Sequence, residues 1–195
     1  MKFITLGPSG SNHEFVTRRY LDFHGLRDSA TMELTPDFEQ GAQALLQDRA
    51  DFMVQCAVHP ATAETVAKCF EGLYVIDSFI SPSQDLAILQ RSDVRHPQSL
   101  AVMPPTLPYI DRSQWRRIEL VETVAQVTRG LIDGTYAAGL GYASAAAMHP
   151  ELLHVAQFVG TVDDAWIVYG RTRLSAGRLT AWRDSPAGRL YRQAA

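Results

Sequence analysis

The sequence predicts an α/β protein built from two lobes. Apolar runs of strand length alternate with segments of helical periodicity along the 195 residues. A first series of alternating strands and helices is followed by a second series, and one more strand pattern lies near the end of the sequence. We therefore expect residues 1–81 and 160–195 to form lobe 1 and residues 82–159 to form lobe 2. In this arrangement the chain crosses between the lobes twice. Such a double connection gives a hinged cleft, where small molecules commonly bind.

The elements expected in lobe 1 follow from turn residues and apolar spacing. Ser11 or Asn12 caps the first helix, and Pro36-Asp37 opens the second. The apolar run 50–58 is typical of a strand buried on both faces. The expected order is strand 2–6, helix 12–24, strand 30–35, a helix ending near 46, strand 50–58, a helix ending near 70 and strand 74–79.

Lobe 2 and the return of the chain follow in the same way. Thr123 caps a helix, and Gly141 ends a strand. The expected elements are strands 85–91, 100–103, 117–121, 136–140 and 153–158, helices 123–131 and 143–148, the returning strand 165–169 and a last helix 175–193. The end of the chain is basic, which indicates a solvated C-terminal helix face or, alternatively, an anionic contact; its arginines are Arg171, Arg173, Arg178, Arg183, Arg189 and Arg192.

Composition and spacing exclude several classes of function. The net charge of -3 gives no reason to expect a nucleic acid partner. No apolar run approaches the ~20 residues that span a bilayer, and the first residues lack the pattern of a signal peptide, so we expect a cytoplasmic protein without membrane contact. Cys56 and Cys69 form no CxxC pair and are expected to be small buried thiols. The histidine spacing predicts no metal site.

The opening strand runs through a Gly7-Pro8-Ser9-Gly10 turn into a helix, and this arrangement is typical of an anion site. Free backbone N–H groups and the positive end of the helix point to one place. We expect a small carboxylate to be bound there by Ser9, Gly10, Ser11, Asn12 and His13. Helix capping alone is the alternative for the serines and Asn12. The helix dipole would lower the pKa of His13 and keep it neutral, unless it is only a surface histidine.

Two further residues are candidates for proton transfer. His59 directly follows a buried strand and precedes Pro60, at the sheet edge where α/β proteins bind ligands. Its side chain can act as acid or base near neutral pH, or it is a structural histidine. In Asp163-Asp164, Asp164 can carry a proton, whereas the alternative is a solvated turn.

Four more side chains are candidates for contact with a ligand. Thr106 and Thr123 lie at strand-to-helix turns of lobe 2, where each caps a helix or faces the cleft. Tyr142 follows a strand and offers a phenol to a bound ring. Trp166 either stacks on a ligand or packs in the core.

Motifs along most of the chain resemble the catalytic domain of prephenate dehydratase. Leu6 to Glu14 is similar to that family's Gly-Pro-x-Gly-Thr-Phe-Ser-x-x-Ala, and Ala50 to Pro60 to its Ala-Asp-x-Gly-Val-Val-Pro-Ile-Glu-Asn-Ser. Glu122 to Ala125 resembles its Ser-Thr-x-x-Ala helix start, and Ala137 to Met148 its small-residue strand and helix. The resemblance implies a fold like the type 2 periplasmic binding proteins. It also implies that members associate, so a homodimer is an expectation from the resemblance alone.

The departures from the family fall on its chemistry. Glu-Asn-Ser becomes Val58-His59-Pro60, and Thr-Arg-Phe becomes Asp164-Ala165-Trp166. The resemblance then implies a diverged member, similar to prephenate decarboxylases, and a lyase for prephenate or a related cyclohexadienyl or aromatic carboxylate. It would use no metal and no organic cofactor, and His59 or Asp164 would move the proton. The chain ends where the family's regulatory ACT domain begins, so phenylalanine feedback is not expected.

Two other functions stay open from the sequence. A non-catalytic protein could bind a small carboxylate in the same cleft and use closure as a signal. An isomerase or hydrolase of an unrelated small acid is the third hypothesis, because a fold does not fix a function.

Overall fold

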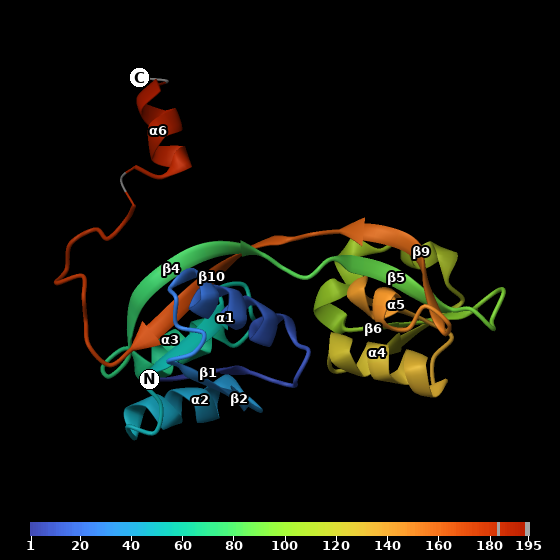
Figure 1. Cartoon of the computed structure of the whole chain (residues 1–195), viewed down its shortest axis with the longest axis horizontal. Coiled ribbons are helices and arrows are strands. Elements are labelled where there is room, and N and C mark those ends of the chain that lie inside the picture. Colours follow the sequence, from blue (N-terminus) through green and yellow to red (C-terminus); the bar gives the residue numbers. More distant parts are fainter. Residues whose placement is uncertain (183, 194–195) are drawn as a thin grey trace.

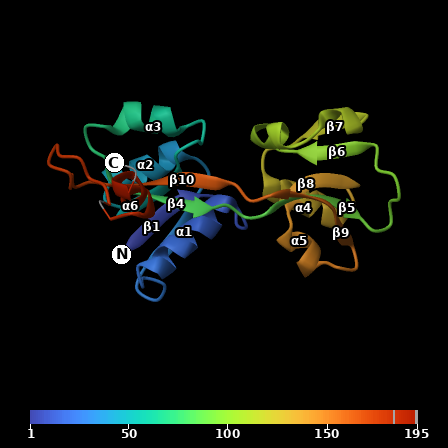
Figure 2. The same cartoon turned by 90° about the horizontal axis from the view of Figure 1, so that it is seen from above.

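The computed structural model describes residues 1–182 and 184–193, which form two five-stranded sheets (Figure 1). We call the part built on each sheet lobe 1 and lobe 2. Seen from above, the two lobes lie side by side along the long axis (Figure 2). No helix within the described ranges has the length and apolar content needed to cross a bilayer.

Lobe 1 has the strand order β2-β1-β3-β10-β4. Strands β1 and β2, and β1 and β3, pair in parallel, whereas β10 runs antiparallel to β3 and β4. Helix α1 covers one face and helices α2 and α3 cover the other, each over its own buried cluster. The bounds are β1 Lys2–Leu6, α1 Asn12–Phe23, β2 Thr31–Thr35, α2 Phe38–Leu46, β3 Phe52–Cys56, α3 Thr62–Cys69, β4 Tyr74–Pro82 and β10 Asp163–Gly170.

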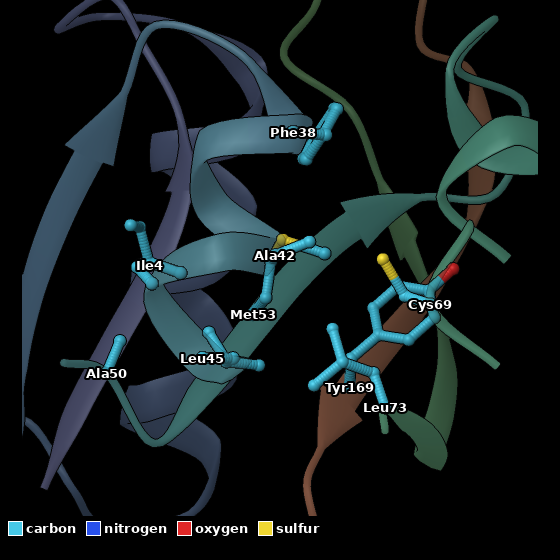
Figure 3. Close-up of a cluster of buried hydrophobic side chains, with 10 residues drawn as sticks. Ile4, Phe38, Ala42, Leu45, Ala50, Met53, Cys69, Leu73 and Tyr169 are labelled. Atoms are coloured by element: carbon cyan, nitrogen blue, oxygen red, sulfur yellow. The ribbon is translucent and has the colours of Figure 1, made fainter. Parts of the chain in front are cut away.

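Burial on both faces of the central strand explains why its sequence is continuously apolar. Met53 packs with Ile4 and Leu45 under α2 (Figure 3), and Val54 packs with Phe3 under α1. The expectation that this strand is buried on both sides is therefore confirmed. The two cysteines are buried free thiols, as expected.

Lobe 2 has the strand order β7-β6-β8-β5-β9. Helices α4 and α5 cover one face, and short 3-10 segments pack on the other. Thr123 caps α4, with its hydroxyl accepting from the N–H of Gln126, as the sequence predicts. The bounds are β5 Leu86–Arg91, β6 Ser99–Val102, η1 Pro104–Tyr109, η2 Arg112–Gln114, β7 Arg117–Leu120, α4 Val124–Asp133, β8 Ala138–Tyr142, α5 Ser144–Met148 and β9 Leu153–Gly160.

The chain passes between the sheets twice, between β4 and β5 and between β9 and β10 (Figure 1). The two connections are hydrogen-bonded to each other. The N–H of Ser83 donates to the carbonyl of Val162 at 2.8 Å, and the Thr161 hydroxyl donates to Asp85. Any movement of one lobe against the other therefore strains or rearranges this paired segment.

Three expected boundaries are wrong, for reasons of strand pairing and turn geometry. Strand β4 continues to Pro82, because β10 pairs with it along its whole length, and this pairing makes Asp163 and Asp164 strand residues. Strand β8 runs to Tyr142 opposite β5, two residues beyond the expected end at residue 140. The turn expected at 104–106 begins a 3-10 helix.

The end of the chain also differs from the expected helix 175–193. Only α6, Pro186–Gln193, is helical, and Figure 1 shows it apart from both lobes. Ala176 and Gly177 have φ of 45° and 78°, which a continuous right-handed helix does not allow. Arg171 is half-buried rather than part of a solvated helix face, and its guanidinium donates to the carbonyls of Leu45 and Ala50. Arg183 and residues 194–195 lie outside the described residues.

Candidate functional site

A cleft of about 900 Å³ lies between the two lobes, within the range of small-molecule sites. On one side, the ends of β1 and β3, the start of α1 and the segment that crosses between the lobes line the cleft. On the other side, η1, the start of α4 and the end of β8 line it. The structure brings eight of the eleven predicted site residues to this cleft: Ser11, Asn12, His13, His59, Thr106, Thr123, Tyr142 and Asp164.

The first turn binds a carboxylate, but that carboxylate belongs to the chain. The hydroxyl of Ser9 and the N–H of Gly10 donate to Glu14 Oε2 at 3.1 and 2.7 Å. Neither residue is among those that line the cleft. The pattern of donors that the sequence assigns to a ligand is therefore used within the turn.

Ser11 and Asn12 line the cleft with side chains that are already engaged. Ser11 Oγ accepts from the N–H of Glu14 and donates to the carbonyl of Leu6. The Asn12 side chain donates a hydrogen bond to the hydroxyl of Ser83 and accepts one from the N–H of Gln84. In the first turn of α1, the N–H of Glu14 is thus capped, and the N–H of His13 has no hydrogen-bond partner among the described residues.

Tyr142 reaches from lobe 2 toward this helix start. Burial raises the pKa of its phenol to about 12; the N–H of Asn12 opposes this shift, and the charge of Asp164 adds to it. The phenol is therefore a neutral hydrogen-bonding group at physiological pH. It meets Asn12 and Asp164 of lobe 1 across the cleft, and its contact with a bound ring stays a prediction.

His13 and His59 lie together at the floor of the cleft. Their ring centroids are 5.6 Å apart, with the ring planes at 81°. His13 Nε2 accepts the N–H of Cys56 at 3.3 Å, and His59 Nδ1 accepts the N–H of Ala61 at 3.1 Å. A neutral imidazole has one acceptor and one donor nitrogen, so the hydrogen is on Nδ1 of His13 and on Nε2 of His59.

Burial keeps both histidines neutral. It lowers the pKa of His13 from 6.5 to about 3, with a smaller contribution from repulsion by His59. It also lowers the pKa of His59. The sequence predicts the direction for His13 from the helix dipole, but the main cause is burial among the rings of Phe38, His59 and Trp166.

Asp164 is held at the cleft by a serine that the sequence interpretation missed. Its Oδ2 accepts a hydrogen bond from the hydroxyl of Ser83, and both residues line the cleft. Within the described residues, Asp164 Oδ1 has no hydrogen-bond partner. Ser83 carries no motif, and only its place in the crossing segment between two strands could have indicated it.

The remaining candidates divide between core and cleft. Trp166 is fully buried in the lobe 1 core, where its ring meets His13 edge-on at 5.0 Å, and it is not among the cleft residues. Thr106 donates to the carbonyl of Met103, and Thr123 caps α4. Both threonines also line the cleft, so capping and a cleft position occur together.

The lining of the cleft is mostly apolar and carries no basic side chain. Neither Lys nor Arg is among the described residues that line it, whereas Glu122 and Asp164 are. With both imidazoles neutral, an anion would be held by main-chain N–H groups, and the first turn of α4 places Val124 and Ala125 at the cleft. The site is therefore suited to a ligand with a large apolar body whose anionic group meets main-chain N–H groups.

No protein-family model and no curated protein sequence matches this chain. Solved structures do match. A prephenate dehydratase from Arthrobacter aurescens in complex with L-Phe has a TM-score of 0.67 at 18% identity, covering 92% of this chain and 63% of its own length. The prephenate dehydratase of Staphylococcus aureus gives 0.65 at 13% identity, covering 89% of this chain and 67% of its own.

A third match is the BvgS periplasmic VFT2 domain of Bordetella pertussis, with a TM-score of 0.53 at 13% identity over 87% of this chain and 80% of that domain. The comparisons confirm the fold implied by the sequence motifs, the two-lobed α/β fold of type 2 periplasmic binding proteins and prephenate dehydratases. This chain spans about 63% of the length of the Arthrobacter protein. Identities this low establish the fold and leave the activity to the site.

Proposed function

We propose that this chain is a lyase that binds a cyclohexadienyl or aromatic carboxylate between its lobes and removes the carboxylate as carbon dioxide. The observation that carries the proposal is Asp164, held by Ser83 on the wall of an apolar cleft whose described lining residues include neither Lys nor Arg. The prephenate dehydratase fold supports the class of ligand. Main-chain N–H groups at the start of α4 hold a carboxylate that the ligand keeps, and the apolar walls receive the ring with the carboxylate that leaves.

The charge of the cleft favours loss of carbon dioxide over loss of hydroxide. Hydroxide leaves with a negative charge, and the described residues that line the cleft include Glu122 but no Lys or Arg that could stabilise that charge. Carbon dioxide leaves neutral. An apolar site also disfavours the localised charge of a carboxylate relative to the dispersed charge of the transition state.

Asp164 supplies the proton that completes this reaction. The bond between the ring and the carboxylate carbon breaks, and its electron pair stays on the conjugated ring. A ring carbon takes the proton of Asp164, and water restores it. General acid catalysis of this kind contributes about 100- to 10,000-fold to a rate. His59 serves as a neutral donor through Nε2, because its Nδ1 already accepts the N–H of Ala61.

Incubation of the purified chain with prephenate, followed by NMR of the products, tests the proposal. We expect a product that has lost carbon dioxide and kept its hydroxyl. Phenylpyruvate as product would show a dehydratase and contradict the account of the cleft charge. Unchanged prephenate that binds, or that fails to bind, contradicts the lyase proposal.

His59→Ala is expected to weaken prephenate binding about 10- to 150-fold, because one hydrogen bond to a charged ligand contributes about 1.5–3 kcal/mol. His59→Gln keeps an N–H donor near the position of Nε2 and should lose threefold or less. The measurement is calorimetric titration with prephenate, with His154→Ala on exposed β9 as the control. Equal affinity in His59→Ala and the wild type would exclude a contact between His59 and the ligand.

A carboxylate sensor is the second candidate function. The basic nitrogens of His13 and His59 both accept backbone N–H groups, which suits fixed binding groups better than proton carriers. The fold of the BvgS VFT2 domain is compatible with this candidate. Tight binding of prephenate without conversion over hours would favour the sensor.

A further inference from the structure

A chain of hydrogen bonds runs through the segment that joins the lobes, and the backbone fixes its direction. The N–H of Gln84 can only donate, and it donates to Asn12 Oδ1 at 3.0 Å. The other atom of that amide is therefore Nδ2, which donates to Ser83 Oγ at 2.7 Å. The Ser83 hydroxyl thus accepts from Asn12 and gives its own hydrogen to Asp164 Oδ2.

We propose that Asn12 and Ser83 are positioning residues that decide which oxygen of Asp164 carries a proton. Because Oδ2 receives the hydrogen of Ser83, a protonated Asp164 holds its own hydrogen on Oδ1. Oδ1 is the oxygen without a partner in the described part of the chain, and Asp164 lines the cleft. The proposal rests on the function proposed above, in which Asp164 delivers a proton to the ligand.

The same chain of bonds ties this arrangement to the position of the lobes. Asn12 begins α1, Ser83 and Gln84 lie in the crossing after β4, and Asp164 lies on β10. Gln84 makes a second contact with the start of α1, where its Nε2 donates to the carbonyl of Gly10 at 3.3 Å. A lobe movement that shifts Gln84 therefore also shifts Ser83, the hydrogen-bond donor to Asp164.

The other groups near Asp164 do not replace this donor. Cys56 on β3 and Tyr142 on β8 interact with its charge, Asp163 precedes it, and Ser81 on β4 stands opposite it in the strand register. The Ser81 hydroxyl donates to the carbonyl of Pro82. Ser81→Ala is therefore a matched control: it removes a serine hydroxyl beside Asp164 without breaking the chain of bonds.

Asn12→Asp tests the direction of these hydrogen bonds, because aspartate has nearly the same shape as asparagine. A carboxylate at residue 12 still accepts from Gln84, but it cannot donate to Ser83. The Ser83 hydroxyl then donates to residue 12, and Asp164 loses its donor. We expect this variant to fold, because an acidic residue in the first turn of a helix interacts favourably with the helix dipole. Ser83→Ala removes the donor directly.

Without the donor from Ser83, Asp164 can hold its proton on Oδ2, away from the ligand. Both variants should therefore lower kcat about 10- to 100-fold and change KM less than threefold. As a general acid, Asp164 acts while it is protonated, so kcat/KM falls as the pH rises. Loss of a hydrogen-bond donor to the carboxylate, and a second carboxylate nearby, both favour the protonated form. The alkaline limb of kcat/KM should therefore move to higher pH in Ser83→Ala and further in Asn12→Asp. Wild-type limbs in both variants would overturn the proposal.

A measurement without turnover separates this proposal from the proposed function. The side-chain carboxyl carbon of Asp164 is followed by ¹³C NMR across pH in the ligand-free chain. Its signal should titrate at higher pH in Ser83→Ala and Asn12→Asp than in the wild type and in Ser81→Ala. This result supports the chain of bonds even where prephenate is not converted. The same titration in all four proteins would overturn it, whatever the activity.

Discussion

Asp164→Asn is expected to lower kcat at least about 100-fold while changing KM less than about threefold. The amide has the size of the carboxyl, and its oxygen still accepts from Ser83, so the cleft keeps its shape. It has no proton to deliver to the ring carbon, and the loss of a general acid costs about 100- to 10,000-fold in rate. The readout is the initial rate of carbon dioxide release from prephenate at saturation.

Asp163→Asn is the matched control for this variant. Asp163 is the neighbouring carboxylate on β10, but it is exposed and is not among the residues that line the cleft. Its rate should stay within twofold of the wild type. A rate for Asp164→Asn within threefold of the wild type would assign the proton to another group, with His59 the next to test.

The free energy of unfolding is expected to fall by about 2 kcal/mol between pH 7 and pH 5 because of His13 alone. Burial lowers the pKa of this imidazole from 6.5 to about 3 in the folded chain. Below pH 6.5 the unfolded chain therefore binds a proton that the folded chain does not. The contribution is fully present above pH 6.5 and is lost as the pH falls toward 3. His59, whose pKa is also lowered by burial, acts in the same direction.

Urea unfolding at pH 5, 6 and 7 measures this dependence. His13→Gln keeps an acceptor for the N–H of Cys56 and removes the titration, so its loss of stability between pH 7 and 5 should be smaller by about 2 kcal/mol. The stability of this variant at pH 7 does not enter the comparison, which uses only the slope. His154→Gln, an exposed position on β9, should keep the wild-type slope. Parallel slopes in all three proteins would contradict a buried neutral His13.

Local signals in the sequence were enough to predict the two-lobed fold. Three helix starts carry their own marker, Ser11 for α1, Asp37 for α2 and Thr123 for α4, and each of these side chains caps its helix. The order of strands in a sheet has no local marker, because it depends on which distant segments pair. The antiparallel insertion of β10 between β3 and β4 is of this kind, and it moved Asp163 and Asp164 from a turn into a strand.

The candidate site was predictable by location and less so by role. The sequence places Asn12, His13, His59 and Asp164 at edges of strands and helices, and all four line the cleft. Their partners are distant in the chain, so the engagement of Asn12 with Ser83 and Gln84 had no sequence signal. In the opening turn, Glu14 supplied the carboxylate for donors that looked free in the sequence.

The most direct test of the account is a crystal structure of Asp164→Asn with prephenate, because this variant should bind the ligand without converting it. We expect the ligand between the lobes, with a ring carbon facing the side chain of residue 164 and a carboxylate at the first turn of α4. A ligand bound outside the interlobe cleft, or with its ring remote from residue 164, would contradict the account.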